Sequence, residues 1–313
     1  MKRQGKRKPI VLASFLAALV LLSAFLPCAA AGASNGLSWK EYINTKWGAI
    51  NAGRQTDGIH AWLFAAANAR NYYLEKNEEK TFSGFQNVLN EYVKAIKDYN
   101  SRHPDRILRN NSGKAGTLED TANYLTAVGI SSRTAYSIVF RDENEDFVDE
   151  LDRQIEKAWA LLEARFLAEN GTPVEAAPIL CNRGGQYMAI VAMDEEKNVC
   201  FVDSMTNRPT WVQKDTMKQR IVRAGQEYVE WEMVIPIGEE KNATHDVIFI
   251  YDDASYREAL AFASGKGDEG REGLTGSVIG EGEIGFVLGF AAAAFLTVVI
   301  LFIRQRKKKP TEA

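Results

Sequence analysis

Histidine and cysteine are scarce in this chain, which has only three of each among its 313 residues. The histidines are His60, His103 and His245, and no two of them have a spacing that places both on one helical face. Cys181 and Cys200 are too far apart for a Cys-x-x-Cys motif. Because transition-metal sites and dithiol redox sites are built from such spacings, we expect neither a metal nor a cofactor.

The sequence leaves open whether Cys181 and Cys200 form a disulfide. An oxidising compartment favours pairing of two cysteines. Both, however, fall in strand-like segments of one expected hairpin, whose turn runs from Asp194 to Asn198. That turn places Ala192, rather than Cys181, opposite Cys200.

Basic residues are concentrated at the two ends of the chain. Lysine and arginine fill five of the first eight positions and all but one of residues 304–309. The formal net charge is nevertheless −3, so the residues between the ends are distinctly acidic and contain no basic stripe. Because nucleic-acid binding depends on clustered lysine and arginine, the sequence argues against a nucleic-acid partner.

The N-terminus has the layout of a secretory signal peptide. Its basic residues precede an apolar run over residues 10–26 and a small-residue stretch over 29–33 that ends in Ala-Gly-Ala. We expect cleavage after Ala33. The alternative is an uncleaved membrane anchor.

The C-terminus predicts a transmembrane helix over residues 284–303, a run of apolar, glycine and threonine residues without charge. A helix of about 20 residues spans a bilayer, and the basic residues that follow are expected in the cytoplasm. A buried core helix is the alternative. The expected organisation is a signal peptide (1–33), an extracellular domain (34–263), a flexible tether rich in glycine and charge (264–283), the membrane helix and a cytoplasmic tail (304–313).

The extracellular domain changes its periodicity halfway along. Residues 82–99 and 147–168 place apolar side chains at spacings of three and four, which is typical of amphipathic helices. Residues 59–75 and 116–128 predict two more helices, the second opened by a capping box at Thr117. The β-rich runs come later, over residues 171–180, 186–193, 199–205, 228–237 and 246–253. Helices first and an antiparallel sheet second indicate an α+β fold with two layers.

Three stretches, in order, resemble the papain-like cysteine peptidases, including their bacterial immunoglobulin-degrading and bacteriocin-processing branches. GRQTDGIHAWLFAAANA (53–69) resembles the nucleophile segment, where a glutamine lies six residues before a cysteine that tryptophan follows. ENGTPVEAAPI (169–179) resembles the strand before the catalytic histidine. GGQYMAIVAMDEEKNVCFVDS (184–204) resembles the hairpin that bears this histidine and ends in an aspartate.

The resemblance implies a papain-like fold and a role for each site position. Gln55 matches the donor to the oxyanion, and Asp203 matches the acid that orients the histidine ring. Ala61 stands at the nucleophile position and Gln186 at the base position. Alanine cannot attack a carbonyl, and glutamine cannot take a proton near neutral pH.

We therefore expect a membrane-anchored cell-surface pseudoenzyme that binds an extracellular peptide or protein in its former groove, next to His60 and Trp62. Two alternatives stay open. The chain is an active extracellular cysteine endopeptidase seen as a disabled variant or with a misaligned motif, or it is a plain adhesion or structural ectodomain. Ordinary roles also compete at single positions, because Gln55 suits an exposed loop and Asp203 suits a turn cap.

Overall fold

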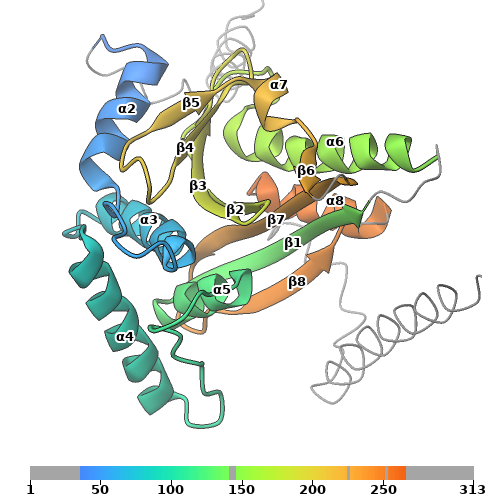
Figure 1. Cartoon of the computed structure of the whole chain (residues 1–313). Helices are drawn as coiled ribbons and strands as arrows, with labels where there is room; N and C mark the ends of the chain where they lie inside the picture. The colour runs from blue at the N-terminus through green and yellow to red at the C-terminus, as the bar shows by residue number, and fades with distance from the viewer. Residues whose placement is uncertain (1–35, 141–145, 224–225, 251–252, 266–313) are drawn as a thin grey trace, which may run out of the picture. The chain divides into compact units, whose positions relative to one another are not determined.

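The computed structural model describes residues 36–140, 146–223, 226–250 and 253–265, which are drawn in colour in Figure 1. The expected signal peptide, membrane helix and cytoplasmic tail, and most of the expected tether, lie outside these residues. Over the described ranges, no helix combines the length and the apolar character needed to cross a membrane.

The helices that the sequence predicts are present in the described residues, with shifted ends. The described helices are α2 (Trp39–Ile50), α3 (Ala61–Lys76), α4 (Phe85–Arg102), α5 (Leu118–Ala127), α6 (Asp146–Phe166), α7 (Lys214–Met217) and α8 (Asp253–Ala263). The capping box at Thr117 is confirmed, since its side chain accepts from the backbone N–H of Asp120 and the Asp120 side chain accepts in return. A second capping box, Ser38 with Glu41, starts α2, a helix that the sequence analysis missed.

One sheet runs through the described domain. Its strands are β1 (Ile130–Phe140), β2 (Ile179–Arg183), β3 (Gln186–Met193), β4 (Val199–Val202), β5 (Thr210–Val212), β6 (Ile221–Arg223), β7 (Gln226–Glu239) and β8 (His245–Phe249). Their order is β5-β4-β3-β2-β7-β1-β8, with β6 paired to β7 outside this path. The turn of the expected hairpin joins β3 and β4, and Ala192 pairs with Cys200 as predicted. Cys181, expected in the same hairpin, lies instead on β2 and pairs with Met188 of β3.

The sheet differs from the prediction in two ways. It is not purely antiparallel, because β1 and β8 run parallel, and it is not confined to the second half, because β1 comes before α6. A hydrophobicity pattern does not reveal β1, since most of its residues that the structure describes as buried are polar. The polar residues buried in β1 are Ser131, Ser132, Arg133, Thr134 and Ser137.

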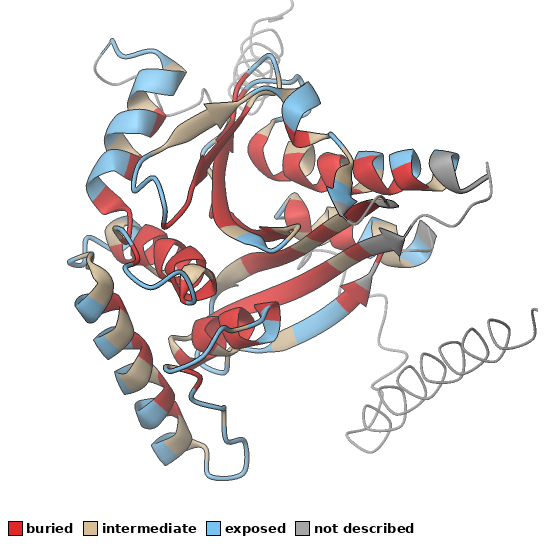
Figure 2. Ribbon diagram, viewed as in Figure 1, coloured by how far each residue is buried: buried red, intermediate tan, exposed pale blue. Residues whose placement is uncertain are grey.

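Helices cover both faces of the sheet, and each face has its own core (Figure 2). Helices α2 to α5 enclose the first cluster, and α6 and α8 enclose the second. Strand β3 contributes Ala189 and Val191 to the first and Met188 and Ile190 to the second. Burial on both faces explains why its sequence is an almost continuous apolar run.

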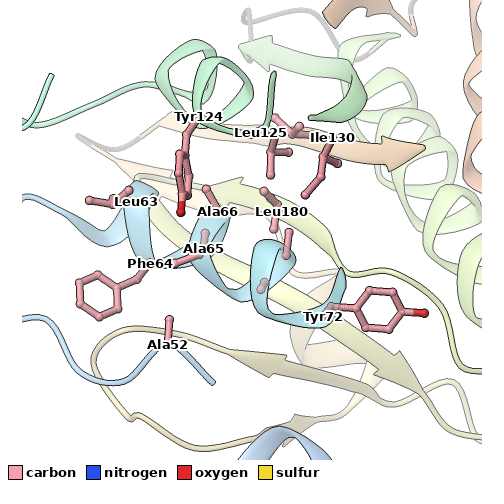
Figure 3. Close-up of a cluster of buried hydrophobic side chains, with 14 of the residues drawn as sticks. Ala52, Leu63, Phe64, Ala65, Ala66, Tyr72, Tyr124, Leu125, Ile130 and Leu180 are labelled. Carbon is pink, nitrogen blue, oxygen red and sulfur yellow. The ribbon is translucent and has the colours of Figure 1, made fainter. Parts of the chain in front are cut away.

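The central helix of the first cluster is α3, which is buried nearly all round. Residues 62–69 and 71–74 are all buried, so the helix has no exposed polar face along most of its length. Figure 3 shows Ala65 and Ala66 between Tyr124 and Leu180, where α3 packs between α5 and the sheet. The alanines let helix and strands approach closely, which accounts for the alanine-rich run of the sequence.

The two described cysteines are unpaired. Cys181 belongs to the second cluster and Cys200 to the first, so they lie on opposite faces of the sheet. Burial raises the pKa of each thiol to about 12. Both are therefore protonated apolar core residues rather than reactive thiolates.

Candidate functional site

The turn before α3 is held by His60 and Asp57. Asp57 accepts hydrogen bonds from the Ile59 backbone N–H at 3.2 Å and from His60 Nδ1 at 2.5 Å. The other ring nitrogen of His60 lies 2.8 Å from the carbonyl oxygen of Ser112. His60 is only 3% exposed, so it ties the start of α3 to a distant loop and does not face solvent.

Ala61 is the first residue of α3 and follows His60 directly. No acidic side chain lies in the first turn of this helix. The Asp57 carboxylate lies just before the helix, against the N-cap residue His60, so it is the acidic group at the positive end of the helix dipole. The methyl group of Ala61 has no donor, acceptor or nucleophile, so the position is chemically inert.

Trp62 anchors the same end of α3 in the core, with an exposed fraction of 1%. Its ring lies against Gly116, where an added Cβ would stand 2.4 Å from the nearest ring atom. The carbonyl oxygen of Gly116 accepts a hydrogen bond from the Tyr187 hydroxyl at 3.1 Å. Gly116 thus connects the N-terminus of α3 to the start of β3.

Gln55 is joined to the turn that follows Asp203. Its backbone N–H donates to the carbonyl oxygen of Ser204 at 3.1 Å, and its side-chain Nε2 donates to the sulfur of Met205 at 3.3 Å. Its Oε1 is buried without a hydrogen-bond partner among the described residues, as is Ser204 Oγ. Gln55 is 7% exposed, so the expectation of an ordinary exposed loop residue does not fit it.

Gln186 and Asp203 meet directly. Gln186 is the first residue of β3, and its Nε2 donates to Asp203 Oδ2 at 3.3 Å. The other carboxylate oxygen accepts from the backbone N–H groups of Met205 and Thr206 at 2.8 and 2.7 Å, and from the Thr206 hydroxyl at 3.0 Å. Asp203 therefore caps its turn, as one of the two alternatives expected, and its other oxygen accepts from Gln186.

The four positions taken from the sequence thus come from elements in contact. Gln186 bonds to Asp203, Gln55 bonds to the two residues after Asp203, and Ala61 opens a helix that packs on β3 and β2. His60 and Trp62, expected in a groove, are both interior side chains that fix the helix start.

Two asparagines with a supporting role escaped the sequence analysis. Asn68 Oδ1 accepts from the backbone N–H of Ala52 at 2.8 Å, which holds the segment leading to Gln55. Asn71 Nδ2 donates to the carbonyl oxygens of Ile50 and Phe82, and its Oδ1 accepts from the Phe82 N–H. The sequence feature that could have identified them is an asparagine within a largely apolar helix. A buried side-chain amide needs hydrogen-bond partners, so it marks a tertiary contact.

Ser204 and His245 are not placed to act as a nucleophile and a base beside Ala61 and Gln186. Ser204 Oγ is buried and has no partner there. His245 lies on β8, beyond β1 from the strands of the candidate site, where burial lowers its pKa to about 4. Among the described residues, no cluster of three or more histidine, cysteine, aspartate or glutamate side chains is arranged to hold a metal ion.

No protein-family model matches the chain, and no curated protein matches it either.

Proposed function

We propose that this chain is a membrane-anchored, cell-surface homologue of the papain-like peptidases that binds a peptide or protein without cleaving it. The observation that carries the proposal is the hydrogen bond between Gln186 and Asp203. The resemblance assigned these residues, 17 positions apart, to a base and its orienting acid. A contact between the two is the geometry that those roles require.

The surroundings of Gln55 support binding to backbone groups. A thioether sulfur is a weak acceptor, so the carbonyl oxygen of a ligand is a better partner for the Gln55 amide than Met205. Gln55 Oε1 and Ser204 Oγ also lack hydrogen-bond partners among the described residues, but both atoms are buried, so they are not counted among the ligand contacts. A peptide carries the complementary neutral donors and acceptors.

The loops beside Ala61 also expose apolar side chains. Ile59 is 40% exposed and Met205 is 58% exposed. Their loops are joined by the hydrogen bond from the Gln55 backbone to Ser204. Apolar side chains beside unmet polar groups are typical of a ligand site, so the proposed ligand has an apolar side chain next to the peptide group that it presents.

Introducing a cysteine and a histidine at the two proposed site positions tests whether those positions have the geometry of a peptidase site. The double variant Ala61→Cys, Gln186→His is expected to hydrolyse a mixed quenched-fluorescence peptide library in a thiol-dependent manner. Each single variant serves as the control and is expected to be inactive, because a thiol without its base, or a base without its thiol, completes no dyad. Iodoacetamide should alkylate the double variant faster at pH 6 than the Ala61→Cys single variant, since the paired imidazolium stabilises the thiolate. Equal alkylation rates and no hydrolysis would count against the papain-like assignment.

Binding by the natural chain is tested separately. Peptides selected on the full chain are expected to lose at least tenfold in affinity on Ile59→Asp and on Met205→Asp, because a charge replaces apolar contact area. Ile107→Asp is the matched control, since Ile107 is 72% exposed and lies in the segment between α4 and α5. Equal losses at all three positions would point to nonspecific hydrophobic capture and remove the groove from the proposal.

A further inference from the structure

A cavity lies at the other end of α3 from the candidate site. Its volume is about 480 Å³, which falls in the usual range for small-molecule pockets. Its walls are formed by the C-terminal ends of three helices, one strand and a loop. These are α3, α6 and α8, the last residues of β7, and residues 174–177. Figure 3 shows Tyr72, one of its lining residues, at the far end of α3 from Leu63 and Phe64.

The unusual group in this cavity is Arg165, in the last turn of α6. It is 8% exposed. Its guanidinium donates to the carbonyl oxygen of Pro236, while its Nε has no hydrogen-bond partner in the described part of the chain. No carboxylate of the described residues forms an ion pair with it. Burial without a counter-charge lowers the pKa of Arg165 below its usual value and is energetically unfavourable.

The carboxylates in the cavity wall are committed to other groups. Glu175 accepts from Lys46 Nζ at 2.6 Å and also from the Tyr42 hydroxyl. Glu239 accepts from Arg70 at 3.1 Å and from Asn77 at 2.7 Å. Arg165 is therefore left without an anion although two acids line the same cavity.

The remaining walls suit the organic part of a ligand. Tyr72 and Tyr73 line the cavity, and burial raises the pKa of each to about 12, so their hydroxyls are neutral. Aromatic side chains supply apolar contact area together with a polar tip. Lys76, at the exposed end of α3, adds a second cation that has no ion-pair partner among the residues described.

We propose that this cavity binds a small organic carboxylate, which accepts hydrogen bonds from Arg165 and packs its apolar part against Tyr72 and Tyr73. A carboxylate fits the planar fork of a guanidinium through two parallel hydrogen bonds. A single negative charge fits better than two, because Glu175 and Glu239 also lie in the wall and the second cation, Lys76, is exposed, where water screens its charge. The proposal does not depend on the function proposed for the other end of α3.

A structural role for Arg165 makes a different prediction. A cation in the last turn of a helix is stabilised by the negative end of the helix dipole. If that stabilisation is the whole role of Arg165, the cavity has no preference for anions and small carboxylates leave the protein unchanged.

The probes are benzoate, the isosteric neutral benzamide and the dianion phenylphosphonate, each titrated into the full chain by calorimetry and by thermal unfolding. Benzoate is expected to bind saturably and to raise the melting temperature. Benzamide and phenylphosphonate are expected to bind at least tenfold more weakly. On Arg165→Met, benzoate affinity should fall at least tenfold, whereas Arg220→Met, which removes a surface ion pair to Asp152 and Glu227, should leave it unchanged.

Arg165→Lys keeps the charge and removes the fork, so it tests the same point if Arg165→Met does not fold. We expect at least a fivefold loss of benzoate affinity on Arg165→Lys. Equal benzoate binding by the natural chain and the Arg165 variants, or no saturable binding at all, would overturn the proposal. Tighter binding of phenylphosphonate than of benzoate would overturn the assignment to a monocarboxylate.

Discussion

The two ends of α3 differ in the kind of polar group that lacks a partner. At the N-terminal end, the acids Asp57 and Asp203 each accept several hydrogen bonds, and the unmet atoms belong to neutral groups, the Gln55 carbonyl and the Trp62 N–H among them. At the C-terminal end, the acids are also satisfied, but the unmet group is the cation Arg165. At the N-terminal end the Gln55 amide, whose partner is a weak thioether acceptor, suits a peptide carbonyl, and at the C-terminal end the unpaired cation suits an anion.

The difference also has consequences for stability. An unpaired neutral group in the interior costs about 1–3 kcal/mol, and an unpaired charge costs several. A ligand at the C-terminal end therefore relieves a larger penalty than a ligand at the N-terminal end. We expect changes at the C-terminal end of α3 to alter mainly the stability of the protein. We expect changes at the N-terminal end to alter mainly its binding specificity.

The largest effect is expected from releasing α3 itself, because both ends depend on its position. Asn71→Leu keeps the approximate volume but leaves the backbone groups of Ile50 and Phe82 without their side-chain partner. We expect a loss of roughly 3–5 kcal/mol in the free energy of unfolding, measured by urea denaturation. Asn90→Leu, the same change at an exposed position of α4, is the control and should stay within about 0.5 kcal/mol. A small effect at Asn71 would show that other contacts fix the helix.

The next effect compares two buried arginines. Arg133 is 5% exposed and pairs with Asp246 at 2.9 Å, whereas Arg165 has no acidic partner among the described residues. Without ligand, Arg165→Met is expected to raise the free energy of unfolding by about 1–3 kcal/mol, because it removes an uncompensated buried charge. Arg133→Met is expected to lower it by about 1–2 kcal/mol, because it removes a paired charge. A loss of similar size from both variants would mean that the dipole of α6 and Pro236 already compensate Arg165.

Hydrophobic periodicity predicted the helices whose side chains are buried either along one face or all round. The expected helices α3 to α6 are confirmed because their apolar residues recur at helical spacing on the buried side, or fill the helix all round. The strand β1 was missed because its interior is rich in serine and threonine, which are satisfied by tertiary contacts. Ser137, for example, donates to Gln154 of α6 at 3.0 Å. The sequence around β1 gives no indication of this partner, because Gln154 lies in a different element.

The candidate site divides in the same way. Gln186 and Asp203 were chosen from the resemblance to the papain-like peptidases, and the β3–β4 hairpin places them within hydrogen-bonding distance of each other. Asn68 and Asn71 were not, because their partners lie in segments before and after α3 that the sequence does not mark as neighbours. From the sequence alone, Arg165 is an ordinary basic residue in the last turn of a helix. Its burial and its missing counter-charge exist only in the folded chain.

The last comparison, at the N-terminal end of α3, concerns Asp203 and ends on the smallest expected effect, its coupling to Gln186. Asp203→Ala removes three hydrogen bonds within its own turn and is expected to cost about 2 kcal/mol, whereas Gln186→Ala removes one 3.3 Å bond at an exposed position and should cost less than about 0.5 kcal/mol. Asp203→Asn is the control, because its amide oxygen still accepts from the turn.

The double variant measures the coupling between the two side chains. We expect less than about 0.5 kcal/mol, since a long bond between an exposed amide and a carboxylate adds little net stability. Such a result would show that Asp203 stabilises the protein through the hydrogen bonds of its own turn. Its contact with Gln186 would then contribute little to stability. A coupling above about 1 kcal/mol would mean that Gln186 itself holds Asp203 in place. That outcome would narrow the difference between the ends of α3, because both would then depend on a polar group that stabilises the fold.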